Sequence, residues 1–146
     1  MRAHRRTDFW RKIFYGYITN NGQFFHLPVN GDFVFEARVD GQYAALYDQA
    51  GRMVRVDAQN WVKCGTEFFD HARHASVVFT REFSDRSKMN DPATSGPVWW
   101  RVVRKPDSLE TLCSSDGKSF TSEPMGYLVP SATAEVGILC AAPEAA

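Results

Sequence analysis

Residues 60–70, NWVKCGTEFFD, decide the fold class of this chain. Successive side chains of a β-strand point to opposite faces, so a strand here would have two unlike sides. One side is mostly apolar and consists of Val62, Cys64, Thr66 and Phe68. The other has charge in its middle and consists of Trp61, Lys63, Gly65 and Glu67. The first side predicts a core. The second raises the question of whether its charges face water or form the wall of a binding site.

The same two-residue alternation recurs along the chain, and no window of a dozen residues keeps a helical stripe. Further short strands are predicted at GDFVFEARVDG (31–41), GRMVRVD (51–57), HASVVFTREF (74–83), VWWRVVRK (98–105), LETLC (109–113) and AEVGILCA (134–141). Turn dipeptides lie between them at Asn21-Gly22, Asn30-Gly31, Asp40-Gly41 and Asp116-Gly117. This pattern predicts an all-β protein, an antiparallel sandwich or barrel, with long loops at 84–97 and 121–134.

Length and charge limit the number of domains and the kinds of partner that the chain can have. A chain of 146 residues is about one domain long, and we expect residues 1–146 to form one domain. Seventeen basic residues balance seventeen acidic ones, which argues against the broad positive surface of a nucleic-acid-binding protein. No segment approaches the ~20 apolar residues of a membrane span, and the start, MRAHRR, lacks the apolar run of a signal peptide. We therefore expect a soluble cytoplasmic protein.

The cysteines give no sign of a metal site. Cys64, Cys113 and Cys140 are far apart, with no Cys-x-x-Cys pair and no His at metal-ligand spacing. We expect reduced thiols that behave as small apolar side chains, and neither a metal ion nor a cofactor.

The pairing of residues 51–57 with 60–69 bears on the charged side. A three-residue loop, 58–60, would set Arg55 opposite Lys63, and two opposed cations destabilise a sheet unless something compensates them. Three explanations are open: a carboxylate on the next strand, with Glu82 opposite Lys63; screening by solvent; or an anionic or polyhydroxy ligand on the sheet. The same register sends Arg52 towards the apolar side, which suits either a position near the sheet edge or a different register.

The neighbours of Lys63 favour the ligand explanation. Gly65 leaves a notch between Lys63 and Glu67, and a strand glycine often marks the close approach of a ligand or of another backbone. Trp61 and Trp99 could offer flat apolar faces to a sugar ring, although core packing is an equal alternative for each.

Four stretches together resemble a known family: TDFWRKIFYGYITNNG (7–22), YDQAGRMVRVDAQNWVKCGTEFFD (47–70), SVVFTREFSDRS (76–87) and WWRVV (99–103). The family is the one labelled regulation of enolase, concanavalin A-like, a domain of unknown function, and the resemblance runs from Thr7 to about Cys140. It implies a jelly-roll β-sandwich of the lectin and glucanase type with one concave sheet face. The family's shared polar positions fall here on Asp48, Gln49, Arg55, Lys63, Glu67 and Arg101.

The chain departs from the family pattern in three places. Family members usually carry more chain before the Thr7–Trp10 segment, so either the start is misassigned or an N-terminal edge of the sandwich is truncated. The family favours His where Gln23 stands, which weakens any metal or acid–base role there. It favours an aliphatic residue where Arg52 stands, which makes the core side of that strand less apolar.

A catalytic role is not favoured. Glucanases of this fold carry a Glu-x-Asp-x-x-Glu type strand motif that places both acids on one face, and the motif is absent here. The pairs Glu67 and Asp70, and Glu82 and Asp85, are each three positions apart and would point to opposite faces of a regular strand.

We therefore expect a non-catalytic domain that binds carbohydrate or a small acidic metabolite on the concave face. The predicted site consists of Asp48, Gln49, Arg55, Trp61, Lys63, Glu67, Trp99 and Arg101. An alternative is an intracellular interaction or regulatory module that acts on a metabolic enzyme, and a second alternative is a glycoside hydrolase-like enzyme.

Overall fold

The structure is a computed structural model that describes residues 1–145, and only Ala146 of the predicted 1–146 domain lies outside it. Its strands are β1 (Phe9–Arg11), β2 (Ile18–Asn20), β3 (Gln23–Asn30), β4 (Phe33–Val39), β5 (Gln49–Arg55), β6 (Asn60–Phe69), β7 (Ala72–Arg81), β8 (Phe83–Asn90), β9 (Val98–Arg104), β10 (Ser108–Ser114), β11 (Thr121–Tyr127) and β12 (Thr133–Ala141). Residues 1–145 include no helix long and apolar enough to cross a membrane. The predicted all-β antiparallel sandwich is confirmed.

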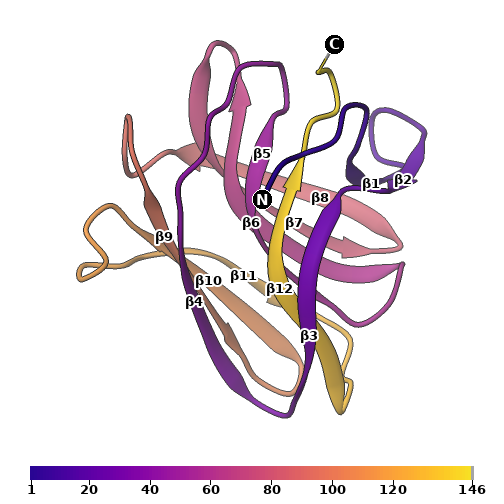
Figure 1. Ribbon diagram of the computed structural model, residues 1–146. Coiled ribbons are helices and arrows are strands. Elements are labelled where there is room, and N and C mark those ends of the chain that lie inside the picture. The colour runs from indigo at the N-terminus through magenta and orange to yellow at the C-terminus, as the bar shows by residue number, and fades with distance from the viewer. Residues whose placement is uncertain (146) are drawn as a thin grey trace.

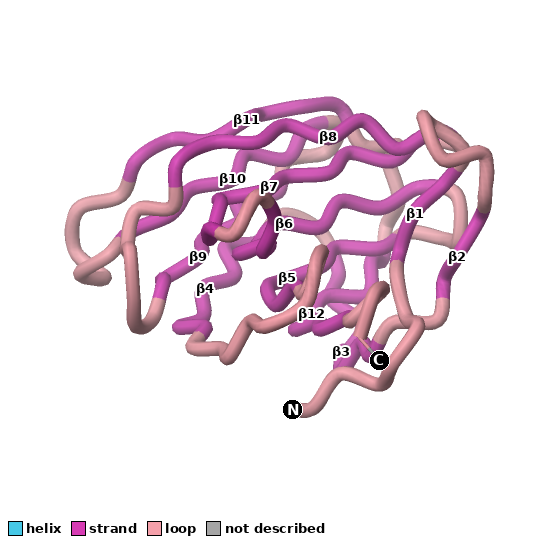
Figure 2. The backbone as a smooth tube through the Cα atoms, turned by 90° about the horizontal axis from the view of Figure 1, so that it is seen from above, coloured by secondary structure: helices cyan, strands magenta, loops and turns pink. Residues whose placement is uncertain are grey.

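The strands form three layers (Figure 1). One sheet has four strands in the order β11-β10-β9-β4, and the other has six in the order β3-β12-β5-β6-β7-β8. The β1–β2 hairpin lies on the opposite side of the six-stranded sheet from the four-stranded one (Figure 2). Below, the inner face of each large sheet is the face turned towards the other, and the outer face is the one turned away.

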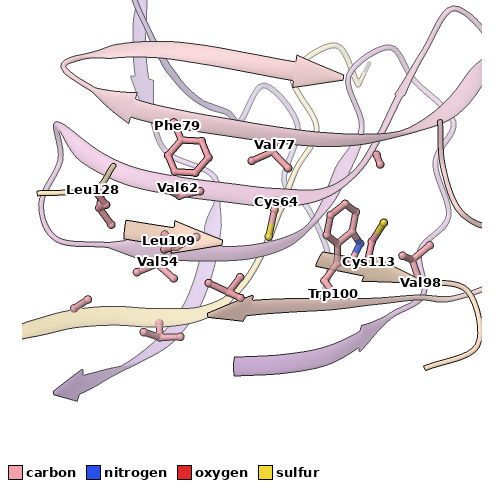
Figure 3. Close-up of a cluster of buried hydrophobic side chains, with 14 residues drawn as sticks. Val54, Val62, Cys64, Val77, Phe79, Val98, Trp100, Leu109, Cys113 and Leu128 are labelled. Carbon is pink, nitrogen blue, oxygen red and sulfur yellow. The ribbon is translucent and has the colours of Figure 1, made fainter. Parts of the chain in front are cut away.

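The main core lies between the inner faces (Figure 3). Val62 and Cys64 of β6 pack there, as the alternation of residues 60–70 predicts. On β9, buried and half-buried residues alternate, so that Trp100 is buried in the core and Trp99 points outward.

The predicted pairing of β5 with β6 was wrong by two residues. Arg55 lies opposite Trp61, and Lys63 lies opposite Met53. The turn lies one residue earlier than predicted: the Val56 amide donates to the Asn60 carbonyl at 2.9 Å, and the carboxylate of Asp57 accepts hydrogen bonds from the backbone amides of Gln59 (2.7 Å) and Asn60 (2.8 Å) within the turn. A shift of two residues keeps every side chain on its predicted face, but it removes the opposed cations.

The predicted 84–97 loop was wrong in its first half. Residues 83–90 form β8, which pairs with β7 along its whole length. This edge strand carries polar side chains on both faces, so backbone pairing rather than apolar alternation holds it. Likewise, much of the predicted 121–134 loop forms β11.

Arg52 is buried in the main core, on an interior strand rather than at a sheet edge. Its guanidinium lies 4.5 Å from the centre of the Phe35 ring and donates to the Phe35 carbonyl. Its Nε and Nη2 have no hydrogen-bond partner among residues 1–145, and burial lowers the pKa of Arg52 to about 10.

Candidate functional site

The β1–β2 hairpin covers the outer face of the six-stranded sheet with a second apolar cluster. Its buried members are Phe9, Trp10, Met53, Trp61, Val78 and Leu139. Trp61 is only 1% exposed and meets the edge of the Phe9 ring at a centroid distance of 6.4 Å. The prediction of an exposed Trp61 platform is corrected accordingly, because the hairpin turns this side of the strand into a second core.

Lys63 is compensated by the hairpin rather than by Glu82. Its side chain is 8% exposed, and Nζ donates to Asp8 Oδ1 (3.3 Å), the Phe9 carbonyl (2.7 Å) and Gln49 Oε1 (2.7 Å). Glu82 lies elsewhere and pairs with Lys12 at 2.6 Å, and that hydrogen bond lowers the pKa of the Glu82 carboxyl. Of the three explanations left open for Lys63, a carboxylate does compensate it, but that carboxylate is Asp8 and not Glu82.

Gly65 marks the close approach of another backbone. It lies opposite Gly51 of β5, and a Cβ on Gly65 would come within 2.3 Å of the Ala50 carbonyl oxygen. The predicted notch is occupied by the neighbouring strand.

Glu67 lies behind an arginine of β8. Its side chain is 10% exposed, and its Oε1 accepts a hydrogen bond from Arg86 Nη1 at 3.4 Å. Within residues 1–145 its Oε2 has no partner. The guanidinium of Arg86 lies over the rings of Phe69 (5.5 Å) and Tyr47 (5.8 Å) and remains partly exposed.

Arg86 forms part of the floor of a groove of about 560 Å³ between the hairpin, β8 and the segment before β5; we call it the hairpin groove. Lys88 lies beside Arg86 on β8, with its ammonium 4.1 Å from the centre of the Phe69 ring. Aromatic and aliphatic side chains supply the walls, namely Trp10, Ile13, Phe14, Tyr15, Leu46 and Tyr47. Asp70 and Asp85 stand at the rim and are well exposed.

Two residues of these walls have a strained backbone. Phe14 (φ 62°) and Tyr47 (φ 64°) adopt the left-handed conformation, which costs a residue with a side chain about 1–2 kcal/mol. Phe14 is also 93% exposed. Such residues gather at functional sites, where the surrounding structure holds them in place.

The two tyrosines of the groove are linked. The hydroxyl of Tyr15 donates to that of Tyr47 at 2.8 Å, and Tyr15 also packs edge-on against Trp10 and Phe14. Burial, together with the bond to Tyr47, raises the pKa of Tyr15 to about 12. The linked pair fixes the wall beside Arg86.

The structure brings Gln49, Lys63 and Glu67 together on β5 and β6, where Lys63 donates to Gln49 at 2.7 Å and Gln49 lies opposite Glu67. The other predicted site residues do not form one site with them. Trp99 and Arg101 lie on the outer face of the four-stranded sheet, where Arg101 pairs with Glu36 at 2.8 Å. Arg55 pairs with Glu135 of β12 at 2.5 Å, on the same outer face as the groove but towards the β3 edge of the six-stranded sheet.

Asp48 and Gln49 have local roles. The carboxylate of Asp48 accepts hydrogen bonds from the amides of Ala44 and Ala45, and Gln49 bridges Asp8 and Lys63 under the hairpin.

Sequence reasoning missed Phe14, Tyr47, Phe69, Arg86 and Lys88 as site residues. The sequence carried little signal for the two cations, because residues 84–88 are polar at both odd and even positions. Without apolar residues on one face, that segment was read as a loop.

A second cleft, of about 730 Å³, opens between the β6–β7 turn and residues 90–96. Its central charges already satisfy each other, because Arg73 and Asp91 pair at 3.1 Å and Asp91 is 3% exposed. In the hairpin groove the ion-pair distances are longer, 3.4 Å for Arg86–Glu67 and 3.8 Å for Lys88–Asp70. The hairpin groove therefore has donors better able to take a new partner.

Known proteins resemble the chain over most of its length. The family described as "Protein of unknown function (DUF1349)" matches residues 1–146. The Saccharomyces cerevisiae protein named "Regulation of enolase protein 1" is 35% identical over 147 residues, covering 99% of this chain and 73% of that protein.

Solved structures share the fold. The crystal structure of a functionally unknown protein from Saccharomyces cerevisiae has a TM-score of 0.92 and 35% identity, over 95% of this chain and 75% of that one. The GH43 BlXynB protein from Bacillus licheniformis has a TM-score of 0.68 and 18% identity, over 79% of this chain and 24% of that one. At that identity the second likeness shows the fold alone.

Proposed function

Since the chain belongs to the family described as protein of unknown function (DUF1349), we propose that it is a non-catalytic domain that binds a small acidic ligand in the hairpin groove. The family resemblance predicted from Thr7 to about Cys140 is confirmed by that match. The ligand class is a carboxylate- or phosphate-bearing molecule with an apolar face, such as a sugar acid or a phosphorylated metabolite. We place the domain in the cytoplasm, in keeping with three buried, unbridged cysteines.

One observation carries the proposal: Arg86 and Lys88 present their charges into the groove from the face of one aromatic ring, Phe69. A guanidinium recognises carboxylate and phosphate through paired donors, and a lysine adds a point charge beside it. The aromatic walls suit the C–H face of a sugar ring. A groove of about 560 Å³ also falls within the usual range for small-molecule sites, roughly 300–1,000 Å³.

Glu67 is a positioning residue in this proposal. Its carboxylate, held behind Arg86, orients the guanidinium towards the groove. The rim acids do not favour catalysis, because both are well exposed and a general acid needs a shielded setting.

The test compares two arginines in a thermal-shift assay with glucose, glucuronate, glucose 6-phosphate and inorganic phosphate. At 100 times its dissociation constant a ligand stabilises the protein by about 2.7 kcal/mol, a rise of a few degrees in Tm. We expect an acidic probe to give this shift with the wild type and Arg55→Ala, and to lose it with Arg86→Ala. Arg55 is a matched control, since it also pairs with a glutamate and lies over a ring, Phe24.

The opposite pattern, with the shift lost in Arg55→Ala and kept in Arg86→Ala, would move the site to the sheet position first predicted. Equal shifts with glucose and with the acidic probes would overturn the acidic class. The absence of any shift across the panel would overturn the proposal.

A second candidate function is a regulatory contact with a metabolic enzyme, which the name of the yeast relative suggests. Exposed apolar side chains gather on and beside the hairpin tip, namely Ile13, Phe14, Ile18 and Leu46. A patch of this kind is typical of a protein contact.

Phe14→Gly separates the two functions. Glycine adopts positive φ without strain, so we expect the variant to be as stable as the wild type or up to about 1 kcal/mol more stable. Under the regulatory function, binding of purified enolase to the immobilised protein is present with the wild type and lost with Phe14→Gly, while Arg86→Ala leaves it unchanged. No binding of enolase by the wild type would count against this candidate.

A further inference from the structure

The four-stranded sheet ends in a strand that is ready to pair. β4 pairs with β9 over residues 33–39 without a break in register, and within residues 1–145 no strand pairs with its other edge, the open edge (Figure 1). Proteins usually blunt such edges with proline, a bulge or a covering segment. Here Pro28 interrupts β3, Pro124 interrupts β11, and the hairpin reaches β8, where the Arg11 amide donates to Ser84 Oγ at 2.9 Å. β4 has neither proline nor glycine.

The six-stranded sheet extends past this open edge. β9 lies against β6, and Arg52 of β5 reaches Phe35 of β4, so the next strands, β12 and β3, lie beyond β4. Phe25 and Leu27 of β3 share the inner face through their pairing with β12, yet they are 74% and 58% exposed. Apolar side chains thus continue the core on the side where the four-stranded sheet stops.

Backbone direction shows which groups the open edge presents. The amide of Lys105 donates to the carbonyl of Ser108 across the β9–β10 turn at 2.9 Å. Since the backbone groups of alternate residues point to opposite sides of a strand, the register with β9 leaves those of Val34, Glu36 and Arg38 pointing to the open edge.

We propose that two copies of this chain pair through β4, antiparallel about a two-fold axis at Ala37. In this register Glu36 lies opposite Arg38 of the partner subunit, and Arg38 lies opposite the partner's Glu36. When the segment Glu36-Ala37-Arg38 pairs antiparallel with a second copy of itself, each glutamate faces an arginine, so two opposite-charge pairs form. The two four-stranded sheets become one eight-stranded sheet, closed by symmetry.

The neighbouring register is excluded by charge. Centring the axis on Glu36 would set the two Glu36 carboxylates opposite each other, which destabilises a strand pair. Arg38 is available to the partner, because its contact with Asp40 is long, 3.8 Å, and its side chain is 54% exposed. On the inner face the same register places Phe35 opposite the partner's Val39. Apolar residues of the two copies therefore meet near Phe25 and Leu27, which are exposed in the single chain.

Exchanging the charges of Glu36 and Arg38 tests the pairing. The mass is measured by sedimentation equilibrium at protein concentrations from about 1 to about 200 µM, a range that covers the dissociation constants of transient interfaces. The 16.5 kDa wild type is expected to approach twice that mass, about 33 kDa, at the upper end. Glu36→Arg and Arg38→Glu alone should each stay monomeric, and the double variant should dimerise again. The double variant does not restore the Glu36–Arg101 pair, so its rescue reports the contact between copies. Glu110→Arg, on the outer face of the same sheet but away from the edge, is the control and should dimerise.

A cysteine at the axis gives a second test. Because the backbone groups of Ala37 point away from the open edge, the two Ala37 residues would form a close pair, with Cα atoms about 4.5 Å apart, within disulfide range. Ala37→Cys should form a covalent dimer on mild oxidation. Val39→Cys, whose partner position is Phe35, should not, and the three native cysteines are buried. A wild type that is monomeric throughout, with no covalent dimer of Ala37→Cys, overturns the proposal; a double variant that stays monomeric overturns the register.

Discussion

Lys63 lies in the middle of the six-stranded sheet, and its contacts decide what the outer face can do. A buried ammonium is tolerated when every donor finds an acceptor, and here three acceptors surround Nζ. Two of them, Asp8 and the Phe9 carbonyl, belong to the N-terminal segment. Lys63 therefore ties the hairpin layer to the sheet. The charged side of residues 60–70 is not an open surface but belongs to a second core.

Lys63→Met should destabilise the protein by about 3–5 kcal/mol, because it leaves the Asp8 carboxylate buried without its cation. Lys12→Met, which removes a lysine from an exposed pair with Glu82, should cost about 1 kcal/mol or less. Urea unfolding of both variants gives the comparison. Similar costs for the two substitutions would contradict the structural role of Lys63.

At this scale the sequence predicted the face of each residue but not its partner. The faces of residues 61–68 follow from the period of a strand alone. The partner of Lys63 lies 55 positions away, in a segment whose docking depends on the whole fold. Trp61 could not be assigned either, because alternation does not tell whether one side of a sheet or both are covered.

At the scale of the element, β5 and β6 are held close by facing glycines. Gly51 and Gly65 lie directly opposite each other, and a Cβ on either would meet the backbone of the other strand. β8 is different, since it has few apolar side chains and is held by its ladder with β7. The strands β5 and β6 could be predicted from alternation, although their register could not. β8 could not be predicted, because edge strands need no apolar face.

Gly65→Ala should destabilise the protein by about 1–3 kcal/mol, as overpacking does, because its Cβ would lie 2.3 Å from the Ala50 carbonyl oxygen and 2.6 Å from Gly51 Cα. Ser76→Ala, one strand over in the same row, should stay within about 0.5 kcal/mol of the wild type. The urea midpoints of the two variants, compared with that of the wild type, test this expectation. A Gly65→Ala protein as stable as the wild type would show that the strands can separate freely.

At the scale of the whole molecule, the jelly-roll class was predictable, and the third layer was not. Short alternating strands and the family resemblance led to two antiparallel sheets, which the structure has. No strand was predicted before residue 31, and the position of the hairpin outside the sandwich depends on contacts with β5, β6 and β7. The candidate groove depends on that position, so it too was missed.

Stability should fall above pH 10. Burial raises the pKa of Tyr15 and of Tyr43 to about 12, and burial with the nearby Asp8 raises that of Tyr17. An unfolded tyrosine ionises near pH 10, so the folded state keeps its full advantage below that pH and loses it between about 10 and 12. Thermal melts from pH 8 to pH 11.5, with tyrosinate absorbance recorded in parallel, measure this. The Tm of Tyr15→Phe should fall less steeply with pH than that of the wild type. Ionisation of these tyrosines before any loss of structure would contradict the expectation.

The contact between the two ends of the fold has a consequence for how the chain folds during synthesis. Arg6 donates its amide to the Ala142 carbonyl at 2.9 Å, and the Ala142 amide donates to the Thr7 hydroxyl at 3.2 Å. Residues 5–11 thus leave the ribosome well before residue 142, and they cannot take their final place until it follows. At ordinary translation rates they wait on the order of 10 s, with the aromatic hairpin exposed to chaperones and to neighbouring nascent chains. Ribosome-bound chains halted before residue 142 should therefore remain sensitive to protease within the hairpin.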